Sequence, residues 1–279
     1  MPLSTTVGRA AVTGSLSLLA LALAASASVA PAAVVAASVG ASPADTGGPP
    51  RVPVEQVSPM LAGAGTALFS CQKPTAPTHC YAPEQVRHAY QVDSLIASGL
   101  DGRGKTIVIV DPYQSPTVRQ DLTTFDSTFG LPEANLTVIA PDGRTSYDPK
   151  DTNQVGWASE ISLDVQWAHA IAPQSDIALV LAKTNTDSDI QSALAYAVDH
   201  DLGDVISQSF GEAEACYGVN VDGIHQPGTT LAAQHAIFVK AQRKGMTVLA
   251  AAGDSGSAQP TCDGKRSVLA ASTPATDPL

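Results

Sequence analysis

Charged residues are scarce in this chain, and positive ones are scarcer than negative ones. Only 15% of the 279 residues are charged, and 15 Lys and Arg stand against 26 Asp and Glu, which gives a formal net charge of −11 at pH 7. A surface with this balance repels polyanions, which excludes nucleic-acid binding as the function. Apolar residues make up 44% of the chain, so the chain is not disordered throughout and is long enough to bury a sizeable core.

Long apolar runs are absent, apart from one near the start of the sequence. Arg9 is the only charged residue among the first 43, and it precedes the apolar stretch AAVTGSLSLLALALA and candidate cleavage sites that end at Ala30. This pattern is typical of a secretory signal peptide, which we predict over residues 1–30. The stretch is too short and too rich in Ala and Ser for a membrane span. We therefore expect a secreted, extracellular protein with no membrane attachment after signal cleavage.

Periodicity is lacking in residues 31–70, where Ala, Val, Ser, Pro and Gly dominate. This composition predicts a disordered linker or a remnant pro-segment rather than a folded domain. We therefore expect one folded domain, over residues 71–279.

Cysteine is sparse, with four residues in the whole chain. An even number suits an oxidising compartment. Cys71 and Cys80 bracket a Pro-rich loop, whereas Cys216 and Cys262 follow two later predicted strands. Of the three possible connectivities, pairing Cys71 with Cys80 and Cys216 with Cys262 is the most economical. The chain has no C-x-x-C motif and no nearby His pair, so metal binding is the weaker interpretation and we expect no metal site.

Apolar runs alternate with helical patterns from residue 105 onward. The expected strands are 106–111, 136–140, 176–182, 204–210 and 246–252, with a further candidate at 267–272. The expected helices run from Ser115 to Gly130, over 154–171, from an Asp187 cap to 200, and over 231–244. This alternation predicts an α/β fold in which helices flank a parallel sheet. Active sites of such sheets lie beyond the carboxyl ends of the strands, here at Asp111, 209–211 and 253–256.

Three motifs are similar to known signatures but stand in the wrong context. GLDGRGKT (99–106) matches a nucleotide-binding P-loop, yet it precedes a strand instead of following one, so we interpret it as a turn. GDSG (253–256) matches the nucleophile motif of trypsin-like proteases, but those are all-β proteins, so Ser255 is not the expected nucleophile. Asn185, Asp187 and Asp189 alternate as in a calcium loop, but the required Gly and Glu are missing, which favours helix capping.

Two acidic residues stand on an otherwise nearly uncharged helix, in the segment VGWASEISLDVQWAHAIAP (155–173). Glu160 and Asp164 are four residues apart, so their side chains share one face, about 5–6 Å apart at Cβ. Like charges at this spacing destabilise a helix, and burial increases the conflict. Two acids at these positions indicate a coupled dyad that holds a proton. The alternative is a solvated strip in which each acid acts alone.

This helix and the segments after it resemble the sedolisins, which are serine-carboxyl peptidases of subtilisin-like fold. The resemblance rests on EISLD at 160–164, Ala-Pro at 172–173 and the strand after it, and covers roughly residues 80–279. It implies that Glu160 is the general base for a serine, that Asp164 orients Glu160, and that Asp254 stands at the oxyanion hole. It also implies that two segments hold the substrate backbone and line the first specificity pocket. Their residues are Ser209, Phe210, Gly211, Ala252 and Gly253.

The implied chemistry agrees with these residue types. Serine needs a base to become a nucleophile. A histidine with a pKa of about 6.5 fails in acid, whereas a carboxylate with a pKa near 4 remains competent. Asp254 can donate a hydrogen bond to an oxyanion only when protonated, which acid or a dry pocket favours. We therefore expect an acid-active endopeptidase that acts on proteins or peptides as a monomer.

The nucleophile motif of the family, Gly-Thr-Ser, has no match in this sequence. Gly-Thr occurs only at 65–66 and 228–229, followed by Ala and Thr. The resemblance places the serine and the ligands of a calcium ion beyond residue 279. We therefore expect this chain alone to be inactive and to hold no cofactor.

Two other interpretations remain open. One is a subtilisin-type hydrolase that uses Asp111, which needs a histidine on the next helix. Glu160 stands where that histidine is expected, and His169 lies nine residues further on. The other is a non-catalytic secreted binding protein on the same scaffold. A downstream Gly-Thr-Ser would favour the peptidase over this last interpretation.

Overall fold

The computed structural model describes residues 69–279, except 74, 76, 78, 79, 218–228 and 263. The predicted signal peptide and nearly all of the predicted linker lie outside these residues. The chain divides into two compact units, Leu19–Cys80 and a larger one described over Tyr81–Leu279. In the smaller unit, the 3-10 helix η1 (Ser70–Gln72) lies beside a disulfide between Cys71 and Cys80, which confirms the first predicted pair.

A five-stranded parallel sheet forms the centre of the larger unit, in the order β2-β3-β1-β4-β6. Its strands are β1 (Thr106–Pro112), β2 (Leu136–Ile139), β3 (Asp176–Ala182), β4 (Val205–Gln208) and β6 (Thr247–Ala250). All five predicted strands are therefore confirmed. The chain runs from β1 to the edge strand β2 and returns to β3, which lies between them. It then crosses to the other side of β1 and continues through β4 to β6. This reversal puts a topological switch point at the carboxyl ends of β1 and β4, where α/β sheets bind ligands.

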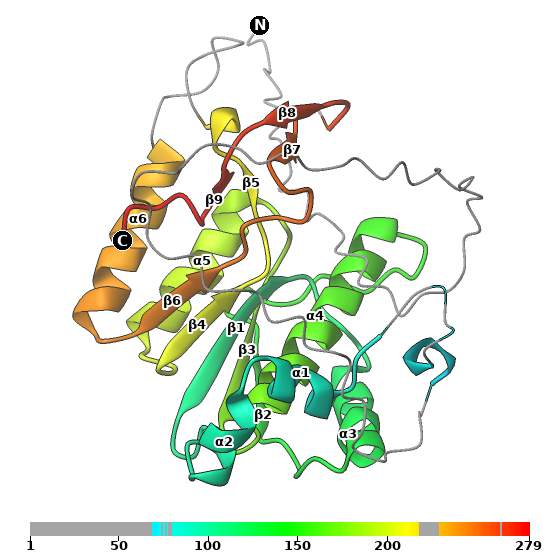
Figure 1. The fold of residues 1–279 in the computed structure, drawn as a ribbon. Helices are drawn as coiled ribbons and strands as arrows, with labels where there is room; N and C mark the ends of the chain where they lie inside the picture. Colours follow the sequence, from blue (N-terminus) through cyan, green and yellow to red (C-terminus); the bar gives the residue numbers. More distant parts are fainter. Residues whose placement is uncertain (1–68, 74, 76, 78–79, 218–228, 263) are drawn as a thin grey trace, which may run out of the picture. The chain divides into compact units, whose positions relative to one another are not determined.

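Two pairs of helices cover opposite faces of this sheet (Figure 1). Helices α3 (Val118–Phe129) and α4 (Thr152–Ile171) pack on one face, and α5 (Asp187–Asp199) and α6 (Thr229–Arg243) on the other. Along β1, Ile109 belongs to the α3 and α4 core, whereas Val108 and Val110 belong to the α5 and α6 core. Because side chains alternate along a strand, Asp111 faces α4.

The start of α4 is fixed by Asp151. Its carboxylate accepts hydrogen bonds from the backbone N–H groups of Asn153 (3.0 Å) and Gln154 (3.4 Å), which satisfies two donors that have no partner within the helix. The predicted helix 154–171 is therefore present and two residues longer at its start.

Two predicted helix starts are wrong. Helix α3 begins at Val118 rather than near Ser115, and its N-cap is Thr117. The Ser115 hydroxyl lies 3.3 Å from that of Ser162 on α4. Helix α5 is capped by Thr186, whose carbonyl accepts the first helical hydrogen bonds, so Asp187 is the first helical residue.

Two short antiparallel pairs extend beyond the carboxyl end of the main sheet. Strand β5 (Glu212–Ala213) pairs with β9 (Ser272–Thr273), and β7 (Ala258–Pro260) pairs with β8 (Ser267–Leu269). The candidate strand at 267–272 is thus divided between β8 and β9 and does not join the parallel sheet. The 3-10 helix η2 (Glu214–Cys216) ends at Cys216, which forms a disulfide with Cys262 in the loop between β7 and β8 and confirms the second predicted pair.

Two short helices, α1 (Pro83–Ala89) and α2 (Val92–Ala97), precede β1. The Arg87 guanidinium Nε donates to the backbone oxygen of Ala170 near the end of α4 (2.5 Å). Segment 99–106 runs into β1 rather than following a strand, in agreement with its interpretation as a turn. In the part of the chain that the structure describes, no helix combines the length and hydropathy needed to cross a membrane.

Candidate active site

Glu160 and Asp164 lie one turn apart on α4, beside the residues that this helix buries against the sheet. Ile161 and Val165 are fully buried in the core that includes β1. Glu160 and Asp164 each precede one of these buried residues by one position, and both acids are partly buried. The two carboxyls interact, as their spacing predicts, because the charge of Asp164 raises the pKa of Glu160.

A third carboxyl, that of Asp111, joins this pair from the carboxyl end of β1. Its side chain is completely buried, and within the described residues neither of its oxygens has a hydrogen-bond partner. Burial, and then the charges of Asp164 and Glu160, raise the pKa of Asp111 well above its ordinary value. We call Asp111, Glu160 and Asp164 the carboxyl cluster.

Burial is the main cause of the pKa shifts across the carboxyl cluster. It raises the pKa of Glu160 to about 7, with further contributions from the charges of Asp164 and Asp254. It raises the pKa of Asp164 to about 6, against a hydrogen bond from the Ser209 hydroxyl that lowers it. The cluster therefore holds protons in acid, as expected of carboxyls that cannot all ionise together.

The pKa of Glu160 is higher than the sequence-based expectation of a carboxylate near 4, because that expectation did not include the burial of this side chain. A hydrogen bond to the charged form lowers the pKa of a carboxyl, as Ser209 does for Asp164. A serine hydroxyl that donates to Glu160 would lower its pKa in the same way. Such a donor would extend the pH range in which Glu160 can act as a base.

The two predicted substrate-binding segments follow adjacent strands. Residues 209–211 come directly after β4, and residues 251–253 come directly after β6, which pairs with β4 in parallel. The hydroxyl of Ser209 reaches Asp164, which connects the first segment to the carboxyl cluster. Asp254 follows the second segment, and its charge acts on Glu160. The structure therefore brings Asp254 to the cluster, at an exposed position and not in the dry pocket that the sequence argument allowed.

Close backbone approaches require glycine in both segments. A Cβ at Gly211 would lie 2.3 Å from the Ser272 hydroxyl, and a Cβ at Gly253 would lie 2.8 Å from Nε2 of Gln259. Gly253 also has φ +92°, a conformation that residues with a side chain rarely adopt. Both glycines thus allow these segments to pack against the β5–β9 and β7–β8 pairs.

The side chain of Phe210 fixes the 209–211 segment to the hydrophobic core. Its side chain is buried in the α5 and α6 core, at 8% exposure. A peptide over this segment would therefore meet the main chain of Phe210 rather than its ring.

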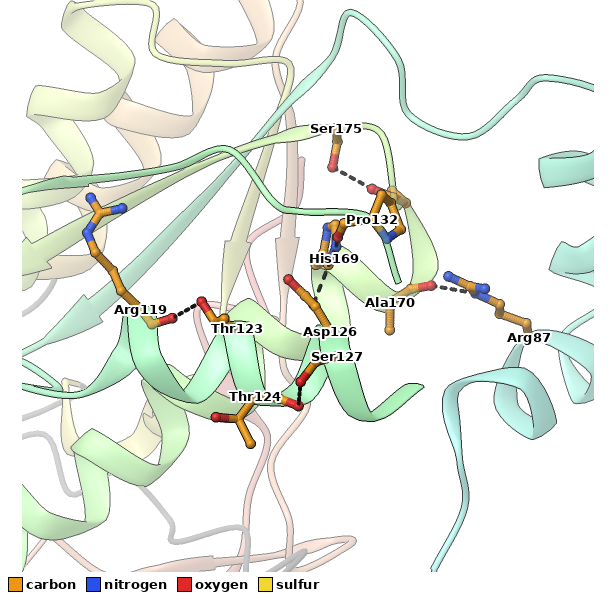
Figure 2. A network of polar contacts seen from close by, with 11 residues as sticks. Arg87, Arg119, Thr123, Thr124, Asp126, Ser127, Pro132, His169, Ala170 and Ser175 are labelled. Carbon is orange, nitrogen blue, oxygen red and sulfur yellow. Dashed lines mark hydrogen bonds and ion pairs between the residues drawn. The ribbon is translucent and has the colours of Figure 1, made fainter. Parts of the chain in front are cut away.

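His169 lies away from the carboxyl cluster, in a buried network between α3 and α4 (Figure 2). Its Nε2 is 2.8 Å from the backbone oxygen of Pro132 and 3.5 Å from Oδ1 of Asp126, and the side chain is fully buried. Asp111 instead faces Asp164 and Glu160. The geometry therefore contradicts a subtilisin-type site built from Asp111 and His169.

The sequence places Asp111 at the active-site edge of the sheet, but its pattern gave this residue a role only in the alternative site and missed its place in the carboxyl cluster. The available signal was an acid at the end of an apolar parallel strand, two residues after a position that faces the same helix. A second group, Asp187, Tyr217 and Glu212, gave no such signal, because its members lie on separate elements. Among the described residues, no set of three His, Cys, Asp or Glu side chains has the geometry to hold a metal ion. The calcium site expected beyond residue 279 stays a prediction.

Comparison with known proteins gives two informative matches, although no family model matches the chain. Kumamolisin from Bacillus sp. (strain MN-32) is 32% identical over 202 residues, which are 70% of this chain and 33% of that protein. The solved structure of Pseudomonas sedolisin, a serine-carboxyl proteinase complexed with two molecules of pseudo-iodotyrostatin, is similar with a TM-score of 0.50 at 26% identity. That match covers 62% of this chain and 46% of the other. The chain thus spans about a third of the length of the curated relative.

Proposed function

The chain belongs to the sedolisin family, and from this membership we propose that it is part of a secreted, acid-active serine-carboxyl endopeptidase that hydrolyses proteins or peptides. The observation that carries the proposal is the carboxyl cluster. Three acids gather at the carboxyl ends of parallel strands without a histidine among the groups that act on them. A serine hydrolase with this arrangement must use a carboxylate as its base.

Each site residue has a role in this proposal. Glu160 takes the proton of the attacking serine, and Asp164 orients Glu160 and shares a proton with it. Asp254, in its protonated form, donates a hydrogen bond to the oxyanion of the tetrahedral intermediate. Ser209, Phe210 and Gly211 on one side, and Ala252 and Gly253 on the other, hold the peptide backbone.

We propose that the catalytic serine comes from residues other than 1–279. The Gly-Thr-Ser motif of the family does not occur in the sequence. We therefore expect the 279-residue chain alone to be inactive, since loss of one member of such a catalytic unit costs several orders of magnitude in rate. Calcium ligands are proposed to lie with the serine. We also propose secretion by the predicted signal peptide and a monomeric state.

A non-catalytic peptide-binding protein is the second candidate, and the missing Gly-Thr-Ser motif favours it. Both candidates bind peptides between the same two segments. They differ in one respect, which is whether a serine completes the carboxyl cluster.

The deciding experiment measures kcat/KM on a peptide from pH 3 to 7 for the chain extended by whatever sequence follows Leu279 in its gene. Glu160→Gln should lower kcat by about 10²–10⁴-fold, because an amide cannot accept the serine proton. Asp164→Asn should also be severely impaired. Glu133→Gln, an exposed acid-to-amide change, is the matched control and should keep full activity.

His169→Gln tests the competing mechanism in the same assay. Its amide can still donate to the backbone oxygen of Pro132, so the fold should tolerate the change. We expect unchanged kcat/KM per folded molecule. An extended chain in which His169→Gln is inactive while Glu160→Gln is active would overturn the carboxylate mechanism, and peptide binding without hydrolysis would support the second candidate.

A further inference from the structure

One tyrosine beside the 209–211 segment contacts two acids. The hydroxyl of Tyr217 lies 2.7 Å from Oδ1 of Asp187 and 2.9 Å from Oε2 of Glu212. Asp187 is the first residue of α5, Glu212 is the first residue of β5, and Tyr217 directly follows η2. We call Asp187, Tyr217 and Glu212 the phenol–carboxyl cluster.

When both acids of the phenol–carboxyl cluster are ionised, the cluster has one proton too few to form both hydrogen bonds. A phenol has one O–H group, so Tyr217 can donate to one carboxyl only and must accept a hydrogen bond from the other. A carboxyl can donate only when it is protonated. Both hydrogen bonds therefore exist together only when the cluster carries one additional proton.

The position of the two acids assigns this proton to Glu212. Asp187 lies in the first turn of α5, where free N–H groups and the helix dipole stabilise an anion. Glu212 lies on a two-residue strand without such donors. Burial raises the pKa of Glu212 to about 7; the hydrogen bond from Tyr217 lowers it, and the charge of Asp187 raises it further. In acid, hydrogen bonds thus run from Glu212 through Tyr217 to Asp187.

Within the described ranges, which leave out 218–228, the elements around Glu212 supply no cation to balance a second anion. Strands β7 and β9 pack against β5, and they consist of Ala, Gln and Pro and of Ser and Thr. The other acid in the first turn of α5, Asp189, accepts a hydrogen bond from the Thr184 hydroxyl (2.5 Å), and Glu214 of η2 is exposed. Among the described residues, Tyr217 and Asp187 are the groups that act on the pKa of Glu212.

This cluster adjoins the proposed substrate-binding segment directly. Glu212 follows Gly211 in the chain, and its backbone oxygen lies 3.4 Å from the Ser272 hydroxyl. Tyr217 follows Cys216, whose disulfide reaches the β7–β8 pair. The cluster therefore ties the end of the 209–211 segment to the start of α5 and to the loop that the disulfide holds.

Resting on the proposed function, we propose that Asp187, Tyr217 and Glu212 are positioning residues, and that the uptake of one proton by them fixes the 209–211 segment for peptide binding. Loss of this proton leaves two carboxylates at one phenol and breaks one of the two hydrogen bonds. Peptide affinity then falls as the pH rises through neutrality, independently of Glu160 and Asp164.

The test measures the Kd of fluorescein-labelled insulin B chain by anisotropy from pH 5 to 8. All variants carry Glu160→Gln, which removes a carboxyl that titrates in the same range and prevents hydrolysis. On this background, we expect the Kd to rise about tenfold over the range. Glu212→Gln should bind tightly at pH 5 and show a smaller rise in Kd towards pH 8, because its amide N–H can donate to Tyr217 without protonation. Tyr217→Phe should bind about tenfold more weakly at pH 5, because no hydroxyl links the two acids.

The exposed Glu214→Gln, two residues from Glu212, is the matched control and should follow the background curve. Thermal unfolding over the same pH range gives a second readout that needs no peptide. Melting temperature should fall with rising pH in the background, and this fall should be smaller in Glu212→Gln. Identical melting profiles with and without Glu212→Gln would overturn the inference. Peptide binding that is absent at every pH would overturn the proposed function instead, while the melting profiles would still decide whether the cluster holds a proton.

Discussion

Asp111 carries the strongest electrostatic conflict of the candidate site. It is the next-to-last residue of β1 and follows an apolar run, and its carboxyl is buried beside two other acids. A buried group without hydrogen bonds destabilises the fold by the desolvation energy it cannot recover. The position is therefore explained by chemistry at the site and not by stability. A raised pKa allows Asp111 to hold a proton beside Asp164 and Glu160.

Asp111→Asn should stabilise the protein at neutral pH. Because the pKa of Asp111 is raised on folding, the folded chain binds more protons than the unfolded chain, and stability falls as the pH rises from about 4. The amide removes this loss, so the free energy of unfolding at pH 7 should rise by about 1–3 kcal/mol, with little change at pH 4. Urea denaturation at both pH values checks this.

Asp142→Asn is the matched control for Asp111→Asn, since Asp142 is an exposed acid. It should change the free energy of unfolding by less than about 0.5 kcal/mol at either pH. Equal losses of stability between pH 4 and pH 7 in the parent and in Asp111→Asn would show that Asp111 does not hold a proton in the folded chain.

At the scale of elements, the sequence predicts best what depends on local patterns. The five central strands were predictable because buried parallel strands are continuous apolar runs bounded by turns. The contact between Glu160 and Asp164 was predictable because helical spacing alone brings them together. By contrast, the hydroxyl of Ser115 lies near that of Ser162 on α4, and this contact between residues distant in the chain exists only in the packed structure.

Contacts between distant elements could not be predicted in this way. Asp111 meets α4 because the order of the strands puts β1 in the centre of the sheet. Tyr217 meets Asp187, 30 residues earlier in the chain, only after β4 and η2 are in place. The apolar periodicity of the sequence does not predict contacts between distant residues. The phenol–carboxyl cluster could therefore be found only in the structure.

Gly253→Ala should damage the 251–253 segment more than its backbone conformation alone would. Gly253 has φ +92°, and a Cβ there would meet Gln259 at 2.8 Å. Gly245→Ala is the matched control, because Gly245 has φ +78° and open space around a Cβ. Each change should cost about 1 kcal/mol through its backbone conformation. Only Gly253→Ala should also weaken peptide binding, about tenfold, because the collision displaces the segment. Equal peptide Kd values for the two variants would contradict the close approach to Gln259.

At the scale of the whole molecule, the two disulfides act on different units. The bond between Cys216 and Cys262 joins residues 46 apart in the larger unit, and the bond between Cys71 and Cys80 joins residues 9 apart in the smaller one. Both tryptophans, Trp157 and Trp167, lie in the larger unit.

Replacing Cys216 and Cys262 by Ser should therefore lower the free energy of unfolding followed by tryptophan fluorescence, by about 4 kcal/mol in the chain-entropy model. Replacing Cys71 and Cys80 by Ser should leave this transition nearly unchanged. Peptide mapping without reduction tests the pairing itself, and a peptide that joins Cys71 to Cys216 would contradict it.

The pH dependence of stability combines all raised and lowered pKa values of the molecule. Burial raises the pKa values of Glu160 and Glu212 to about 7 and that of Asp164 to about 6, so the folded chain binds extra protons between about pH 4 and 7. Stability should then fall on the alkaline side, by at least about 3 kcal/mol from pH 5 to pH 8.

On the acid side, the opposite sign applies. Asp199 and Asp204 have lowered pKa values, because hydrogen bonds from Lys240 and Lys105 stabilise their charged forms. Their contribution is lost as the pH falls through those lowered values, but both acids are exposed, so this loss is small. Maximum stability should therefore lie near pH 4–5, below the pH of about 5–8 that is usual for proteins. Urea denaturation from pH 3 to 8 measures this curve. A maximum at or above pH 7 would mean that the buried carboxyls are ionised in the folded chain, and that neither cluster holds its proton.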